Sequence, residues 1–177
     1  MRIEFFCPGL PKGAGSKSAF AVKKQGAYTG KVIVTDSSGA AGKHWRSEVT
    51  SIAFKTMADL GLAPLQEAVI LRCKFIMPRP KHHYGTGRNS GVLKDNAPSV
   101  HTSAPDATKL VRAVEDSLKN LCWRDDAQVV EQHIFKRYGD QPGCHVTIVP
   151  YAEEMILRES LPKVDFALEV DNVGSPE

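Results

Sequence analysis

The chain has 177 residues, of which 42% are hydrophobic, so it can bury the core of one ordinary domain. Its 23 basic and 20 acidic residues give a net charge of +3, and no stretch approaches the roughly 18 apolar residues of a membrane helix. The N-terminus shows no apolar run followed by a small-residue cleavage site, which predicts a cytoplasmic protein without a signal peptide. Fibrous, wholly disordered and membrane-spanning classes are therefore excluded.

The charges are unevenly distributed along the chain. Residues 1–46 hold eight basic residues and two acids, and residues 72–112 hold the same numbers. Residues 113–177 reverse the balance, with six basic residues and thirteen acids. Two basic segments beside an acidic one suit a phosphate-binding surface that contains a cation site. An ordinary charged surface is the alternative, and on charge alone it is the more common explanation.

The sequence of the N-terminal third predicts a first strand, then a hairpin, then a helix. Residues 2–7 form the first strand, which prolines end, and residues 12–18 form a loop rich in glycine and lysine. Short runs at 19–22 and 31–36 flank a glycine-containing segment and predict a hairpin. Apolar residues at helical spacing predict a first helix over 41–60.

The rest of the chain alternates strands with one helix. Gly61 suits the position after the first helix, and residues 67–77 alternate as in a strand. Residues 78–104 hold too much glycine, proline, asparagine and serine for a long regular element, which predicts a long basic loop. A second helix is predicted over 105–119, and a turn at 122–128 then leads into two final strands.

This order of elements predicts the fold class and its limits. We expect an α+β (mixed α/β) single domain, a mixed sheet with two main helices packed on it. The domain is expected to span 1–151, and residues 152–177 to form an acidic, loosely ordered tail. Buried free thiols are predicted for the four cysteines, which lack the spacing of a zinc site: Cys7, Cys73, Cys122 and Cys144.

Residues 101–130 carry the pattern that points to chemistry. Asp106 opens the second helix, Asp116 follows about three turns later, and Asp125–Asp126 lie in the next turn. A helix followed by a turn can return the chain, so we expect Asp106 and Asp126 to approach each other. Clustered carboxylates suit a hard divalent cation such as Mg²⁺, and Arg112 is placed to stabilise developing negative charge.

Each of these residues also has an ordinary explanation. An aspartate at a helix start, such as Asp106, is commonly a cap. Two aspartates in a turn, such as Asp125–Asp126, are commonly solvated turn residues. Arg112 and Asp116 have the spacing of a simple surface ion pair. Residue types and spacing alone therefore do not decide between a metal-dependent site that acts on phosphodiesters and ordinary surface residues.

The same segment resembles the signature of the RusA family of Holliday junction resolvases. That signature runs Pro-Asp-x-Asp-(Asn/Lys)-Leu, then a Lys, then Asp-Ala-Leu, then Trp-x-Asp-Asp-x-Gln-Val. This chain reads Pro105-Asp106-Ala107-Thr108-Lys109-Leu110, then Arg112, then Asp116-Ser117-Leu118, then Trp123-Arg124-Asp125-Asp126-Ala127-Gln128-Val129. The flanking elements fit as well, so the resemblance covers most of residues 1–150, with the 78–104 insertion outside the family's minimal core.

The resemblance implies a specific activity. Members of the family are homodimers that bind DNA four-way junctions and cut two strands of like polarity with Mg²⁺ or Mn²⁺, in DNA recombination and repair and often in phage or prophage genomes. It implies catalytic aspartates at Asp106 and Asp126, with Asp125 beside the second. The supporting lysine falls on Arg112, which keeps the charge but not the geometry.

The main departure from the family is Thr108, which occupies the place of a second catalytic aspartate. A threonine hydroxyl is a poor substitute for a carboxylate ligand, so we expect Asp116 or Asp125 to complete the metal site. A non-catalytic binder of branched DNA, with a degraded metal site, is the alternative that this departure favours. A protein–protein module that acts through the acidic tail is a third.

Basic residues in the loops and at the second helix are the candidate contacts to DNA phosphates. They are Lys12, Lys17, Lys23, Lys24, Arg79, Lys81, Arg88 and Lys109. A mobile, solvated loop is the alternative for residues 78–104. The adjacent His82 and His83 are poor candidates for a metal site, because neighbouring residues rarely both reach one ion.

Overall fold

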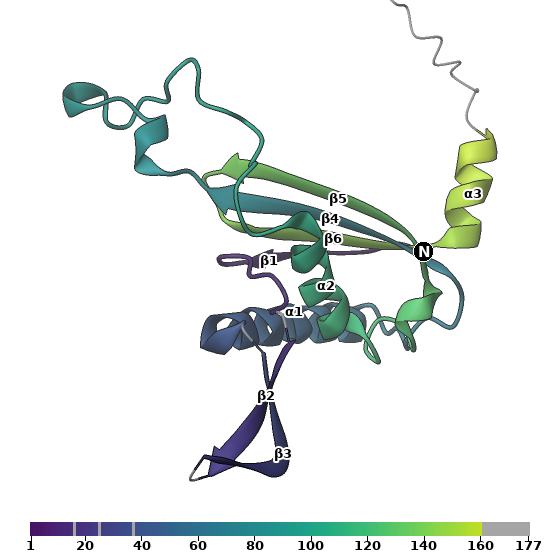
Figure 1. Ribbon diagram of the computed structural model, residues 1–177. Helices are drawn as coiled ribbons and strands as arrows, with labels where there is room; N and C mark the ends of the chain where they lie inside the picture. Colours follow the sequence, from purple (N-terminus) through teal and green to yellow (C-terminus); the bar gives the residue numbers. More distant parts are fainter. Residues whose placement is uncertain (16, 25, 37, 161–177) are drawn as a thin grey trace, which may run out of the picture.

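The computed structural model describes residues 1–15, 17–24, 26–36 and 38–160, and it confirms the predicted α+β domain. A four-stranded mixed sheet in the order β1-β6-β4-β5 forms the centre, and β2 and β3 pair as a separate ribbon (Figure 1). The strand β4 is parallel to β5 and antiparallel to β6. The strands and longer helices are β1 (Ile3–Pro8), β2 (Lys17–Lys24), β3 (Ala27–Asp36), α1 (Gly39–Asp59), β4 (Val69–Pro78), α2 (Ala107–Leu118), β5 (Val129–Gly139), β6 (Gly143–Pro150) and α3 (Tyr151–Ser160).

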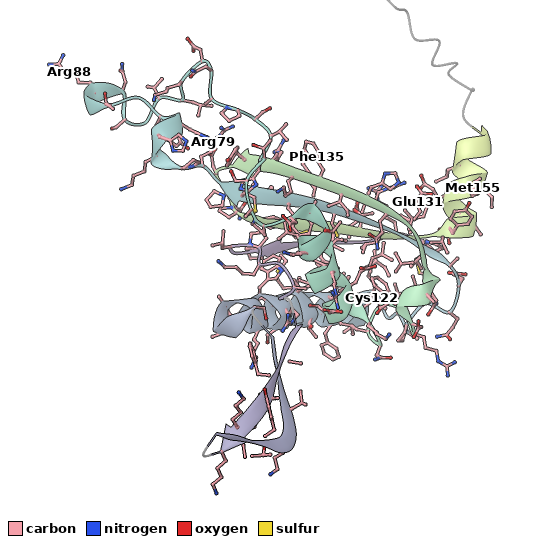
Figure 2. The ribbon with its side chains drawn as sticks, in the orientation of Figure 1. Arg79, Arg88, Cys122, Glu131, Phe135 and Met155 are labelled. Carbon is pink, nitrogen blue, oxygen red and sulfur yellow. The ribbon has the colours of Figure 1, made fainter. Side chains whose placement is uncertain are left out.

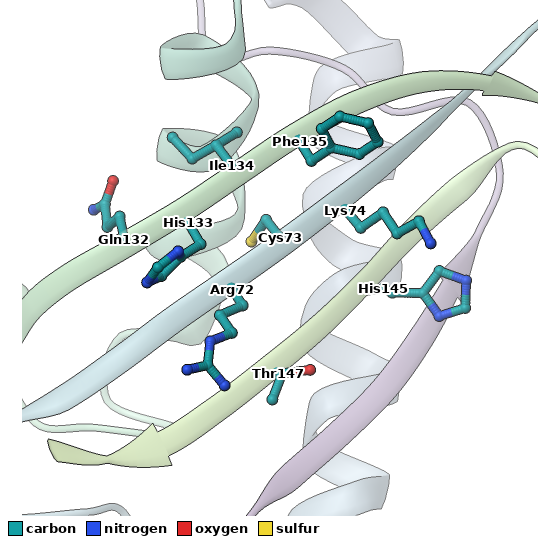
Figure 3. A pocket seen from close by; sticks show the side chains of 9 residues that line it. All are labelled: Arg72, Cys73, Lys74, Gln132, His133, Ile134, Phe135, His145 and Thr147. Carbon is teal, nitrogen blue, oxygen red and sulfur yellow. The ribbon is translucent and has the colours of Figure 1, made fainter. Parts of the chain in front are cut away.

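The core lies between the sheet and the two helices α1 and α2, which cover the same face (Figure 1). Side chains of β4 alternate between the two faces of the sheet, and Arg72 and Lys74 point away from the helices (Figure 3). Each fully buried large aliphatic side chain stabilises the fold by about 1.5–3 kcal/mol. The buried residues that meet in this layer include Trp45, Val49, Met57, Leu71, Phe75, Leu110, Val114, Leu118 and Ile148.

Several local expectations are confirmed. Gly61 follows α1 with φ of 64°, the left-handed conformation that glycine adopts without strain. The four cysteines are buried and free, as expected. Among the described residues, no helix combines the length and the apolar character needed to cross a bilayer.

The expectation of a loose tail from residue 152 is wrong for its first part, because residues 151–160 form the helix α3. Tyr151 N donates to Ala68 O at 2.8 Å, and Arg72 Nη2 lies 2.6 Å from Glu154 Oε1. The N-terminal amino group also pairs with Glu153. These long-range contacts dock α3 at the end of the sheet. Residues 161–177 lie outside the described residues. The expected domain boundary at residue 151 stays a prediction.

The long loop between β4 and α2 contains two short 3-10 turns, η1 (Lys81–His83) and η2 (Gly87–Asn89), and no longer element, as expected. Rings anchor the loop to β5: His83 lies 4.8 Å and His101 4.9 Å from Tyr138 between ring centroids. The Tyr138 backbone N–H also donates to Ser99 O at 2.9 Å. Both ends of the loop are therefore packed on the sheet, and its tip extends away from it (Figure 1).

The β2–β3 ribbon projects from the body of the protein (Figure 1). Phe20 and Ile33 pair across it, and their side chains are 59% and 54% exposed. Lys23 Nζ lies 4.6 Å from the centroid of the exposed Tyr28 ring. A two-stranded ribbon with apolar residues in water is marginally stable alone, so this projection is suited to contact another molecule.

Candidate active site along helix α2

Asp106 lies directly before the first residue of α2, in an extended conformation with ψ of 144°. Its carboxylate makes no capping hydrogen bond to the helix. It faces Lys109 instead, whose Nζ lies 3.1 Å from Asp106 Oδ2. Asp106 therefore does not cap α2, although capping is the common role of an aspartate at this position. Its exposed carboxylate is available to a ligand.

The segment that carries Asp106 is fixed by two contacts that the sequence patterns did not indicate. Lys136 Nζ on β5 donates to the carbonyl oxygens of Ser103 and Pro105, both at 2.8 Å. The backbone N–H of Ala14 in the first loop donates to Lys109 O at 2.7 Å. The first loop and β5 therefore hold the N-terminal end of α2 in place.

Asp125 has a structural role in the turn after α2. It accepts a hydrogen bond from the Ala127 backbone N–H at 3.0 Å, and Gln128 Oε1 accepts one from the Asp125 N–H at 2.8 Å. This pair is a capping box at the start of the short turn η3 (Asp126–Gln128). Gln128 Nε2 also donates to Leu65 O at 2.9 Å, which fixes the turn beside β4.

Asp126 is not used as a cap. Its Oδ1 accepts a hydrogen bond from the Trp123 indole N–H at 3.1 Å. Lys119 Nζ lies 3.3 Å from both Asp126 Oδ2 and Asp125 Oδ2, and its hydrogen bond to Asp126 is the main cause of a raised pKa of the Lys119 ammonium. The hydrogen bond from Ala127 N–H, with Lys119 second, lowers the pKa of Asp125. Lys119 is thus the resident cation of the pair.

Glu115 is a candidate site residue that the sequence patterns did not indicate. It is half-buried on α2, and Gln132 Nε2 donates to its Oε1 at 2.5 Å. Burial, and then the negative charges of Asp126 and Asp116, raise the pKa of this carboxyl. Glu115 and Asp126 are therefore close enough to repel, and a cation bound between them would relieve the repulsion.

The expected approach of Asp106 to Asp126 within one chain is wrong. The helix α2 has 12 residues, so roughly 18 Å separates its ends. Asp106 lies at one end and the Asp125–Asp126 turn lies beyond the other. Within the described ranges, no three His, Cys, Asp or Glu side chains gather closely enough to hold a metal ion. The predicted metal ligands thus form two separate groups.

Between the two groups, α2 presents a row of polar side chains. Thr108, Arg112 and Glu115 are spaced by three or four residues and share one side of the helix. Arg112 is exposed and Asp116 does not pair with it in the described part of the chain, so the ordinary alternative of a surface ion pair is not observed. The row therefore carries a hydroxyl, a guanidinium and one carboxylate along one helix.

Glu115→Gln is expected to stabilise the protein at neutral pH and to change little in acid. The folded protein binds the Glu115 proton more tightly than the unfolded chain, so ionisation above the ordinary pKa of 4.5 lowers stability as pH rises. Glutamine removes this loss and can still accept the bond from Gln132. Thermal unfolding between about pH 4 and about pH 8 measures the difference in Tm. A difference that is equal at all pH values, or larger in acid, would contradict this origin.

The predicted DNA-contact residues lie in three places. Lys12 and Lys109 lie near the N-terminal end of α2, and Lys23 and Lys24 lie on the ribbon. Three more lie in the long loop, where Figure 2 shows Arg79 near the sheet and Arg88 at the tip: Arg79, Lys81 and Arg88. The side chain of Lys17 lies outside the described residues. The basic residues therefore surround the helix end rather than form one patch.

A shallow depression of about 700 Å³ lies on the helix-free face of the sheet, over β4, β5 and β6 (Figure 3). Phe135 is 50% exposed there. The basic and aromatic side chains around the depression are Arg72, Lys74, His133, Phe135 and His145. Alternation along the strands places them on one face.

Surface carboxylates near basic loops are compatible with a nuclease domain that uses a metal ion, but they do not define one. Comparison with known families does, because the family model described as "Endodeoxyribonuclease RusA" matches residues 10–149. The chain belongs to the RusA endodeoxyribonuclease family, as the resemblance of residues 105–129 predicted. It is also similar to the Bacillus subtilis (strain 168) protein described as "Uncharacterized protein YqaN", with 38% identity over 122 residues that cover 67% of this chain and 80% of the relative.

Proposed function

We propose that this protein is a divalent-metal-dependent endonuclease that resolves Holliday junctions and other branched DNA in recombination and repair. The observation that carries the proposal is the contrast among the signature aspartates. Asp106 and Asp126, at the family's catalytic positions, are not used as caps, whereas Asp125 is. The test is cleavage of a labelled four-way junction with Mg²⁺, beside the same reaction with a chelator.

The donor set around Asp126 fits a hard divalent cation. Glu115 and Asp126 are oxygen ligands of the kind that Mg²⁺ and Mn²⁺ take, and Lys119 already compensates their charge in part. Asp106 is the ligand proposed at the other end of α2. A divalent cation bound at these carboxylates would polarise the phosphoryl oxygen and favour ionisation of an attacking water.

The remaining roles belong to the chain's own side chains. Arg112, between the two carboxylate groups, is placed to offset the negative charge that develops on the phosphate. Lys12 and Lys109 are proposed to hold the DNA backbone at the N-terminal end of α2. Trp123 orients the Asp126 carboxylate through its indole N–H.

We propose a homodimer, in which two such sites cut two strands of one junction. The exposed apolar side chains of the β2–β3 ribbon, Phe20 and Ile33, support a contact with another molecule. In a dimer, Asp106 of one protomer is able to lie close to Asp126 of the other protomer. Within one chain, the length of α2 keeps these two carboxylates apart. Sedimentation at micromolar concentrations tests the dimer, and a monomer at all concentrations would contradict it.

A non-catalytic binder of branched DNA is the second candidate, and Thr108 is the observation that favours it. Thr108→Asp supplies the carboxylate that the family carries at this position. If Glu115 has taken over that function, the variant is expected to cut a junction within about threefold of the wild-type rate. Cleavage that begins only in the Thr108→Asp variant would show that the natural site is degraded. Single-turnover cleavage with Mg²⁺ distinguishes the two.

Removing the ribbon lysines is expected to weaken junction binding and its salt dependence. If Lys23 and Lys24 each neutralise a phosphate, the double alanine variant loses roughly 0.9 units of salt slope per contact. Fluorescence anisotropy over a range of salt concentrations measures the slope. Lys55→Ala is the matched control, because Lys55 pairs with Asp59 on α1, away from the ribbon. An unchanged salt slope in the double variant would show that the ribbon lysines do not contact DNA phosphates. Negligible DNA affinity of the wild type would instead favour a protein–protein module.

A further inference from the structure

A pocket opens beside Asp106 that the proposed cleavage chemistry does not use. Its volume is about 420 Å³, within the range of small-ligand sites. The first loop, the end of β4 and the segment directly before Asp106 form its walls. The residues that matter for its chemistry are Leu10, Pro11, Lys12, Met77, His101 and Pro105.

His101 gives the pocket an unsatisfied polar group. Its side chain is 8% exposed, and its Nδ1 is one of three buried side-chain nitrogens without a hydrogen-bond partner among the described residues. Burial, and then the nearby Lys136 charge, lower the pKa of the imidazole, which favours the neutral ring. A buried polar atom without a partner costs stability, and a ligand that supplies the partner would recover it.

The walls favour a flat ligand that carries a phosphate. Pro11, Pro105 and the Met77 thioether offer apolar surfaces to the faces of an aromatic ring. Lys12 lines the same pocket and gives its rim a positive charge, whereas Lys109 lies outside the lining and pairs with Asp106. A planar heteroaromatic group with polar edges, attached to a phosphate, is a nucleotide.

We propose that this pocket binds one unpaired nucleobase of the DNA, next to the phosphate that Asp106 faces, and that His101 recognises the edge of that base. The inference rests on the proposed function, because it needs DNA at Asp106. Bases at a branch point are the least stacked in the substrate, so their entry costs the least. The pocket then makes the cleavage position depend on sequence, which backbone contacts alone do not do.

The experiment places 2-aminopurine, in turn, at each position around the branch of a four-way junction, with Ca²⁺ in place of Mg²⁺ to hold the complex uncut. The wild type is expected to raise the fluorescence several-fold at one position, as that base leaves the stack. Ala104→Phe, which fills the pocket from an exposed position, is expected to abolish the rise. Val92→Phe, on the exposed loop outside the pocket, is the matched control and retains it.

His101→Phe tests the recognition separately, because it keeps a ring against Tyr138 and removes both nitrogens. Its expected effect is about a tenfold loss of base preference at one position in a junction library, with junction affinity retained. Wild-type cleavage without base preference, together with no fluorescence rise at any position, would overturn this inference and leave the proposed function intact. A fluorescence rise without cleavage in either Mg²⁺ or Mn²⁺ would support the pocket and overturn the proposed activity.

Discussion

Asp126→Asn is expected to lower the rate of junction cleavage by roughly 100-fold to 1,000-fold while leaving junction binding nearly unchanged. Asparagine keeps the shape and still accepts the Trp123 indole hydrogen bond, so the turn stays folded. It removes the negative charge that a divalent cation needs. Single-turnover cleavage and anisotropy, measured on the same junction, separate the two effects.

Asp125→Asn is the matched control for this prediction. Asp125 is adjacent in sequence and shares Lys119, but its carboxylate caps the turn that follows. Asparagine is as good a cap as aspartate, so the control is expected to stay within about threefold of the wild-type rate. Equal losses in the two variants would contradict the division of roles between the two aspartates.

Trp123→Ala is expected to lower the free energy of unfolding by about 3–5 kcal/mol. The side chain is fully buried among core residues, and its truncation leaves a cavity that the surrounding sheet and helix fill only in part. The variant also loses the hydrogen bond that orients Asp126. Urea denaturation followed by circular dichroism measures the change, and a loss below about 1 kcal/mol would contradict the proposed packing.

Trp123→Phe separates the two functions of this side chain. Phenylalanine fills most of the space, so the loss of stability is expected to be smaller than in the alanine variant. It has no N–H, so the orientation of Asp126 is lost in both variants. A folded Trp123→Phe protein with wild-type cleavage would show that the indole hydrogen bond does not position the carboxylate proposed to act in cleavage.

Local patterns predicted most of the fold, because α1, α2 and the strands are specified by short-range periodicity. The spacing of apolar residues in 41–60 and 105–119 is visible without knowledge of the partner surface. The helix α3 was missed because its stability comes from distant partners. Ala68 and Arg72 dock it on the sheet, and neither contact leaves a sign in the acid-rich segment itself.

The candidate site was predicted less completely, because it too depends on contacts between residues far apart in the sequence. Resemblance identified Asp106 and Asp126, but the length of α2 separates them in one chain. Glu115 has no distinctive sequence context, since its raised pKa depends on burial and on charges brought close by folding. Asp125 followed three residues later by Gln128 is the local signal of a capping box, and it could have identified the structural role of Asp125.

The proposed cutting of branched DNA with a divalent cation can be followed in a single series of cleavage reactions. Wild-type protein is incubated with a synthetic four-way junction and, separately, with a linear duplex of the same sequence, in Mg²⁺, in Mn²⁺ and in a chelator. The predicted result is a pair of nicks of like polarity near the branch point, dependent on the cation, with the duplex left intact. Tight junction binding without cleavage in either metal, or equal cutting of the duplex, would contradict the claim.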